Sequence, residues 1–255
     1  MRNLSQSVKI SLISYVNTWP FLHGLKKSCF SFFPEIIEEY PAQTAQSIKK
    51  GKVDVALVPV AVLPELDNVE VFSDFCIGAD GKVDTVLLHS DVKLPEIKKI
   101  YLDYQSRTSN ALIKILAQKY WNIMPEWISA EKGFENQIKG TTAGVVIGDR
   151  NFSGFPHTYT YDLAEEWKKH TSLPFVFAVW VAKKEIHQNV LEALNDAFRK
   201  GLNELENNIF LKQKPKPEQE ELLFYLKERI SYPFDWAKKE ALQKFLFLME
   251  EAVVV

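Results

Sequence analysis

An almost unbroken apolar run, Val53–Val60, constrains the fold of this chain more than any other segment. The run is rich in valine and is interrupted only by Asp54 and Pro59. Strands that are apolar on both faces are typical of parallel sheets covered by helices on both sides. Gly51, just before the run, has the position of a glycine that stops a preceding helix. The segment therefore predicts a buried strand in an α/β fold.

Strand and helix patterns alternate along the rest of the chain. Runs of β-branched and aromatic residues predict strands, and apolar residues at helical spacing predict helices. The expected strands are residues 8–13, 53–60, 69–72, 75–77, 83–89, 99–103, 127–129, 143–149 and 174–182. The expected helices are residues 19–27, 43–50, 111–120, 131–139, 162–167, 189–209, 218–229 and 235–251. Such alternation predicts an α/β fold with right-handed crossovers.

The chain has 255 residues, a length at which a single core stops growing and chains tend to divide. Two strand-rich blocks followed by a helical tail predict two lobes. The chain is expected to leave the first lobe, form the second, and return to the first. We expect residues 1–89 with 177–255 to form the first lobe and residues 90–176 to form the second.

The charge of the chain is nearly balanced, with 31 Lys and Arg residues, 33 Asp and Glu residues and a net charge of −2. Nucleic acids and acidic membranes require a concentrated basic field, so neither is expected as a partner. Met1–Ser7 is polar, and no stretch reaches the ~18 apolar residues of a membrane span, so we expect a cytoplasmic protein. Cys29 and Cys76 lack metal-ligand spacing and are expected to be two buried thiols, with a disulfide or metal pair as the alternative. The oligomeric state is left open.

The familiar catalytic motifs are missing from the sequence. It contains no GxGxxG, GxxxxGK[ST], HExxH or GxSxG segment and no Cys/His cluster with metal-ligand spacing. These absences disfavour dinucleotide chemistry, P-loop phosphoryl transfer, and zinc or serine hydrolysis. The remaining classes are a ligand-binding protein and an enzyme without a cofactor that works by positioning and electrostatics.

Four loops follow predicted strands, where ligands bind in open α/β sheets. They are residues 14–18, 79–85, 106–109 and 148–150. The third loop combines three hydroxyls with a guanidinium at a helix N-terminus, which suits a carboxylate or phosphate ligand; its residues are Ser106, Arg107, Thr108 and Ser109. The alternative is that Ser106 or Thr108 caps the helix and Arg107 pairs with an acid.

Other polar residues of these loops also have two interpretations. Tyr15 and Asn17 are placed to orient a ligand by hydrogen bonds, although asparagine is equally common there as a turn former. Asp149 either faces a ligand or serves as a helix cap or a partner of Arg150. For the single histidines, such as His89, a structural role is more common than a catalytic one.

Five segments in order resemble the chorismate dehydratases, a family of menaquinone biosynthetic enzymes that opens the futalosine route. The resemblance is collinear from about residue 8 to residue 182. It rests on Ser14–Pro20, Gly51–Val60, Ser106–Ser109, Ile147–Asp149 and Leu173–Trp180. The family fold is that of type II periplasmic binding proteins, with two α/β lobes around a central ligand cleft and, here, a helical C-terminal segment. The resemblance implies a cofactor-independent hydro-lyase that converts chorismate to 3-[(1-carboxyvinyl)oxy]benzoate and water.

The resemblance also carries residue roles to this chain. It implies that Asn17 and Ser106–Ser109 line the cleft, with Tyr15 and Asp149 among the substrate-binding residues. The family segment Gly-x-Val-x-Ser-Val corresponds to Gly81–Val86, with Thr85 in place of the usual serine. The hydroxyl is retained, so ligand contact is expected to survive, and the added methyl group of threonine leaves the details of substrate fit open.

The proton-abstracting base is not identified by these motifs. Asn17 cannot accept a proton at neutral pH, and a carboxylate such as Asp149 is disfavoured beside a dianionic substrate. Our hypothesis is that the enolpyruvyl carboxylate of chorismate removes the ring proton while Asn17 and Thr85 orient the ring and its hydroxyl.

Two other functions remain open at this point. One is a cytosolic solute-binding protein that holds a small carboxylate without transforming it, because fold does not fix function. The other is an enzyme like 1,4-dihydroxy-6-naphthoate synthase, which shares the fold and the pathway. That activity requires a histidine base, and no histidine falls in a matched motif.

Overall fold

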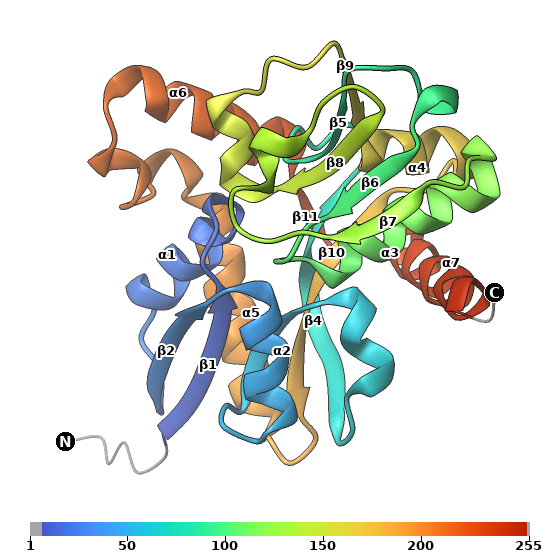
Figure 1. The fold of residues 1–255 in the computed structure, drawn as a ribbon. Coiled ribbons are helices and arrows are strands. Elements are labelled where there is room, and N and C mark those ends of the chain that lie inside the picture. Colours follow the sequence, from blue (N-terminus) through green and yellow to red (C-terminus); the bar gives the residue numbers. More distant parts are fainter. Residues whose placement is uncertain (1–6, 254–255) are drawn as a thin grey trace. The chain divides into compact units, whose positions relative to one another are not determined.

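The computed structural model describes residues 7–253 and divides the chain into two units (Figure 1). The first unit contains the residues up to 77 together with 178–235, and the second contains 78–177 together with the residues from 236 onward. The chain therefore passes from one unit to the other three times. The division expected from the sequence differs from this one, because it assigned residues 78–89, 177 and 236–255 to the first lobe.

The first unit contains a six-stranded sheet in the order β11-β4-β10-β3-β1-β2. Strand β1 is parallel to β2 and β3, whereas β10 runs antiparallel to β3. The bounds of the strands are Ser7–Ile13 (β1), Phe33–Glu39 (β2), Val55–Pro59 (β3), Val69–Ala79 (β4), Phe175–Lys183 (β10) and Ser231–Pro233 (β11).

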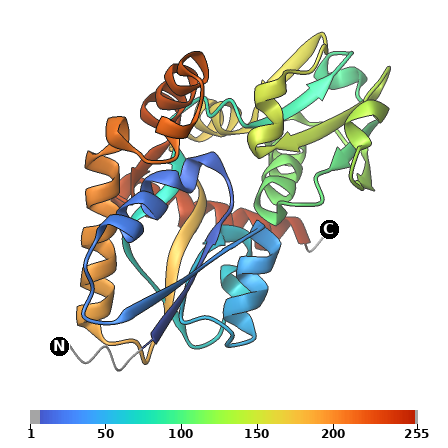
Figure 2. The ribbon, with the colours of Figure 1, turned by 90° about the vertical axis from the view of Figure 1, so that its left-hand side faces the viewer.

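Helices cover both faces of this sheet, with α1 and α5 on one face and α2 on the other (Figure 2). The helices of the unit are Trp19–Lys27 (α1), Pro41–Lys49 (α2), Gln188–Asn203 (α5) and Lys216–Phe224 (α6). Every residue of β3 is buried. The prediction from the apolar run is confirmed, because a strand between two helical layers excludes water from both faces.

Helices α1 and α5 approach each other closely at two glycines. A Cβ atom on Gly24 would lie 1.8 Å from the carbonyl oxygen of Ala197, and one on Gly201 would lie 1.8 Å from that of Pro20. Beside this crossing the buried His23 contacts Glu204 at 3.0 Å through Nε2 and accepts the backbone N–H of Ile209 through Nδ1. His23 therefore has a structural role.

The second unit contains a five-stranded sheet in the order β7-β6-β8-β5-β9. Its strands are Val86–Ser90 (β5), Lys99–Leu102 (β6), Glu126–Ser129 (β7), Thr142–Ile147 (β8) and Tyr159–Asp162 (β9). Its helices are Arg107–Ile115 (α3), Leu163–Thr171 (α4) and Trp236–Val253 (α7). Strand β6 is parallel to β7 and β8, and β5 is antiparallel to β8 and β9.

The C-terminal helix α7 packs within the second unit, against α3. The ring of its buried Phe245 lies 6.2 Å from that of Trp167 and 5.2 Å from that of Phe175. These aromatic contacts explain why the helix belongs here rather than with the first lobe.

Some local predictions were wrong. The segments 69–72 and 75–77 form one strand, β4, which continues to Ala79 instead of turning at Gly78. The helix expected over 131–139 is reduced to a 3-10 turn at Phe134–Gln137, between Gly133 and Gly140 with left-handed backbone angles. Cys76 is buried, whereas Cys29 is exposed, and no disulfide joins the two. Within residues 7–253 no helix is long and apolar enough to cross a bilayer.

Candidate functional site

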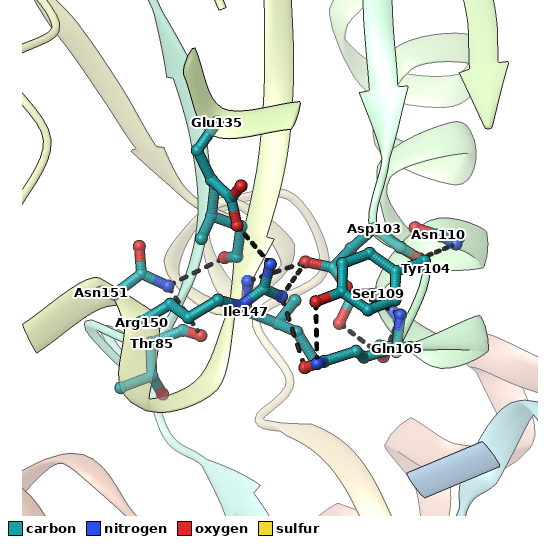
Figure 3. A network of polar contacts seen from close by, with 12 residues as sticks. Thr85, Asp103, Tyr104, Gln105, Ser109, Asn110, Glu135, Ile147, Arg150 and Asn151 are labelled. Atoms are coloured by element: carbon teal, nitrogen blue, oxygen red, sulfur yellow. Dashed lines mark hydrogen bonds and ion pairs between the residues drawn. The ribbon is translucent and has the colours of Figure 1, made fainter. Parts of the chain in front are cut away.

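In the second unit, the start of β5 lies on the same side of the sheet as the ends of β6 and β8. Val86, the first residue of β5, pairs with Ile147, the last residue of β8, and β6 runs parallel to β8. The loops that follow β6 and β8 therefore lie at the same edge as the loop that precedes β5. We refer to Thr85, Asp103–Ser109 and Asp149–Asn151 as the polar edge (Figure 3).

Ser106 caps helix α3. Its Oγ accepts the backbone N–H of Ser109 at 3.1 Å and lies 2.9 Å from the Ser109 hydroxyl. Thr108 is buried and donates to the carbonyl of Phe177 at 3.4 Å, whereas Arg107 is exposed. The capping interpretation of Ser106 is confirmed, and ligand contact by Ser106–Ser109 remains a prediction.

A buried ion pair joins the loops that follow β6 and β8. The fully buried carboxylate of Asp103 accepts the backbone N–H groups of Gln105 at 2.8 Å and Ile147 at 3.3 Å, and it also binds Nη2 of Arg150. Nη1 of Arg150 donates to Glu135 at 2.6 Å. Figure 3 shows the guanidinium between the two carboxylates. One cation thus fixes three segments of the chain.

Burial and charge act in opposite directions on this pair. Burial raises the pKa of Asp103, and the Arg150 charge only partly opposes it. Burial alone lowers the pKa of Arg150, but Asp103 and Glu135 raise it overall, so the guanidinium stays charged. The Cζ atom of Arg150 lies 5.3 Å from the centroid of the Tyr104 ring, which adds a cation–π contact. Arg150 already contacts the carboxylates of Asp103 and Glu135 and the ring of Tyr104, so we assign it a structural role.

Sequence reasoning missed Asp103, Glu135 and the role of Arg150. Asp103 ends a predicted strand just as Asp149 does, and that position is the signal that should have brought it into the candidate set. Arg150 was considered only as a partner of Asp149. The structure instead pairs it with Asp103 and Glu135, and it places Asp149 half-buried in a 3-10 helix over Gly148–Ser153.

The segment before β5 that carries Thr85 is held by a buried aspartate. Oδ2 of Asp162 accepts the backbone N–H groups of Val83 at 2.8 Å and Asp84 at 2.7 Å. Its Oδ1 caps α4 through the N–H groups of Ala164 and Glu165. Asp84 has a left-handed φ of 63°, so this segment needs an external anchor.

The same aspartate makes stability depend on pH. Burial raises the pKa of Asp162 to about 6, and the four N–H donors only partly oppose this. The folded chain therefore binds a proton more tightly than the unfolded chain, and Asp162 stabilises the fold increasingly as the pH falls through 6. We expect the stability gap between the natural chain and Asp162→Asn to widen by about 1 kcal/mol from pH 7 to pH 5. Urea unfolding of both chains at the two pH values measures this gap, and a constant or narrowing gap would contradict the assignment.

The first loop of the sequence lies in the first unit, after β1. Ser14 donates its N–H to the carbonyl of Glu39 at 2.9 Å, and the Thr18 hydroxyl bonds the carbonyl of Ile13 at 2.7 Å. The buried Tyr232 of β11 donates to the carbonyl of Asn17 at 3.0 Å. Burial raises the pKa of Tyr232 well above its usual range, so its hydroxyl remains a donor. The Asn17 peptide is therefore held by a residue 215 positions later in the chain.

The predicted site residues are thus distributed over both units. Tyr15 and Asn17 belong to the first unit, and Thr85, Ser106–Ser109 and Asp149 belong to the second. Within residues 7–253 no three His, Cys, Asp or Glu side chains form a group that could hold a metal ion.

Comparisons with known proteins agree with the fold. A family model described as menaquinone biosynthesis matches residues 8–251. The chain is 28% identical over 217 residues to the chorismate dehydratase of Thermus thermophilus, a match that covers 77% of this chain and 78% of that protein.

Two solved structures are similar over nearly the whole chain. One is a protein of Archaeoglobus fulgidus, with a TM-score of 0.74 and 12% identity, covering 98% of this chain and 99% of that one. The other, from Candida albicans, is described as having the generic periplasmic binding protein fold; its TM-score is 0.63 and its identity 12%, over 98% and 90% of the chains. The predicted α/β fold of the periplasmic-binding-protein kind is confirmed.

Proposed function

The chain belongs to the menaquinone biosynthesis family, and from that membership we propose that it is a chorismate dehydratase. The observation that carries the proposal is the match to the Thermus enzyme along about three quarters of both chains. The proposal includes a hydro-lyase reaction without a cofactor, a place in the futalosine route, and action in the cytoplasm. The biosynthetic role of the family supports these finer statements.

The reaction needs little from the protein beyond orientation. The ring carbon that bears the enolpyruvyl ether loses a proton, the neighbouring carbon loses its hydroxyl, and the ring becomes aromatic as one water leaves. We assign proton removal to the enolpyruvyl carboxylate of the substrate. Asn17 and Thr85 orient the ring and the departing hydroxyl, and this positioning lowers the barrier by reducing the entropy lost in the transition state.

The substrate is a dianion, so the site must supply positive potential. Arg150 is already matched by Asp103 and Glu135. The polar edge also presents the N-terminus of α3, which begins at the exposed Arg107 and whose dipole favours an anion. We therefore assign the binding of one substrate carboxylate to this helix terminus.

Two carboxylates of the polar edge differ as candidates for a protein base. Asp103 accepts two backbone N–H groups and one guanidinium, so its lone pairs are engaged. Asp149 is only half-buried. If Asp149→Asn abolished turnover while chorismate still bound, proton removal by the substrate would have to be replaced by a protein base.

The direct test follows chorismate by ultraviolet absorption. We expect the natural chain to produce the aromatic benzoate spectrum, and Asn17→Ala to lower kcat at least about tenfold because orientation is lost. The control is Asn189→Ala, which changes an exposed asparagine at the start of α5 and should keep full activity. Absence of benzoate formation by the natural chain would overturn the proposal.

The binding-protein fold favours a second candidate, a solute-binding protein for a small carboxylate. Tight binding of chorismate without conversion, measured by calorimetry, would support this function instead. An enzyme like 1,4-dihydroxy-6-naphthoate synthase is disfavoured because it requires a histidine base. His23 and His89 are both buried and hydrogen-bonded to residues of their own units.

A further inference from the structure

The reaction proposed above makes no use of His89, a buried histidine on β5. Its Nε2 lies 2.9 Å from Oδ1 of Asn151, and its Nδ1 lies 3.5 Å from the hydroxyl of Thr160. The rings of Phe155 and His157 pack against it at 5.0 and 5.6 Å. A polar ring in such surroundings is stable only while its hydrogen bonds are kept.

Asn151, a residue of the polar edge, connects this ring to Thr85. Its Nδ2 donates to the carbonyl of Val146 at 2.9 Å and to the carbonyl of Thr85 at 3.2 Å (Figure 3). The Thr85 carbonyl also accepts the N–H of Gly148 at 2.8 Å. One carboxamide therefore fastens the residue before β5 to the end of β8.

These contacts fix the tautomer of His89. Because both carbonyl oxygens are acceptors, the amide nitrogen of Asn151 must face them, and its oxygen must face His89. The oxygen is an acceptor, so Nε2 of His89 carries the proton and Nδ1 is left as an acceptor for Thr160. Burial lowers the pKa of His89, which keeps the ring neutral near pH 7.

We propose that His89 and Asn151 form a positioning pair that fixes the Thr85 peptide, and through it the Thr85 hydroxyl, for the dehydration of chorismate. This inference rests on the proposed function. Both residues act through Thr85 and neither is assigned a contact with the substrate. The Thr85 backbone is thereby held from two sides, by Asn151 and Gly148 at its carbonyl and by Asp162 at the two preceding N–H groups.

The pair should affect kcat more than KM. A residue that orients the departing hydroxyl contributes mainly in the transition state, where a small displacement is costly, whereas one substrate carboxylate is assigned to the N-terminus of α3. In Asn151→Asp the side chain keeps its shape but cannot donate to either carbonyl. We expect kcat to fall about tenfold or more with KM changed less than about threefold.

Two substitutions of His89 are expected to lower kcat and to restore it. His89→Phe keeps a ring of similar size without a donor, and we expect it to reproduce part of the loss in kcat. His89→Gln restores an N–H donor toward Asn151 and should recover activity. His157→Gln is the matched control, because it alters the neighbouring ring but leaves the bond between His89 and Asn151.

A double-mutant cycle tests whether His89 acts through Asn151. If it does, adding His89→Phe to Asn151→Asp lowers kcat no further. Equal kcat in Asn151→Asp and the natural chain, or fully independent losses from the two positions, would overturn the proposal.

Hydrogen exchange at the Gly148 amide gives a readout that does not depend on chorismate. That amide donates to the Thr85 carbonyl, so its protection should fall in Asn151→Asp and His89→Phe and return in His89→Gln. If the natural chain does not convert chorismate, the proposed function fails, while this exchange pattern still decides whether the pair fixes the Thr85 segment. Unchanged protection in Asn151→Asp and His89→Phe would overturn the positioning role.

Discussion

Asp103→Asn will lower the free energy of unfolding by about 3 kcal/mol, a typical cost of removing one partner from a buried ion pair. The asparagine has the same shape, but its amide nitrogen must replace one carboxylate oxygen. It then faces either the Gln105 N–H at the Oδ1 position, or the Ile147 N–H and the Arg150 guanidinium at the Oδ2 position, and all of these groups are donors. After this change, the ion pair of Arg150 with Asp103 is lost and the one with Glu135 is kept. Urea unfolding followed by circular dichroism measures the loss.

Glu135→Gln is the matched control for this change. It also removes one charge beside Arg150, but the glutamine oxygen still accepts from Nη1, so the expected loss is about 1 kcal/mol. Equal stability of the Asp103→Asn chain and the natural chain would show that the buried pair does not hold the loops together. The folded fraction of Asp103→Asn should also bind chorismate more weakly, because the segment before Ser106 is no longer fastened to β8.

Gly24→Ala will destabilise the first unit by about 3 kcal/mol. In an ordinary helix the same change stabilises by about 1 kcal/mol, so here the sign itself is diagnostic. The new methyl group would meet the carbonyl oxygen of Ala197 and the backbone nitrogen of Gly201. Backbone atoms cannot turn away as a side chain can, so α1 and α5 must separate.

Gly201→Ala should cost a similar amount, because its methyl group would meet the Pro20 carbonyl across the same crossing. Once either change has separated the helices, the other should cost less, and the double variant should be more stable than the sum of the two losses predicts. Glu192→Ala, on the exposed side of α5, is the control and should change stability by less than about 0.5 kcal/mol. Thermal unfolding without any loss in Gly24→Ala would contradict the close crossing.

The parts of the fold that the sequence predicted well are those in which local pattern and burial agree. The Val53–Val60 run predicted the buried β3, and the helix expected at 19–27 has the observed bounds of α1. Strand β2 was missed because Phe33–Glu39 carries Pro34 and three glutamates and lies at the edge of its sheet. Edge strands tolerate charge and proline, so their pattern resembles that of a loop.

Long-range partners were not predictable in the same way. The helical pattern of α7 was recognised, but an apolar helix face does not reveal which of two cores it covers. The cap at Ser106 is local and was foreseen as an alternative. The pair of Asp103 and Arg150 joins residues 47 positions apart, and it is set by the register of β6 against β8. Periodicity contains no information about that register.

The three passages of the chain between its units also decide the order in which the protein can mature on the ribosome. The first unit, whose first strand spans Ser7–Ile13, stays incomplete until β10 and β11, which end at residues 183 and 233, have been synthesised. The second unit waits for α7, whose Phe245 closes the aromatic cluster around Trp167. Consecutive domains can fold one after another as they emerge, whereas the segments of these two units alternate along the chain, so neither unit is complete before part of the other has been synthesised. Strand β3 therefore waits for its partner β10 on a nascent chain that already carries residues 78–177 of the second unit.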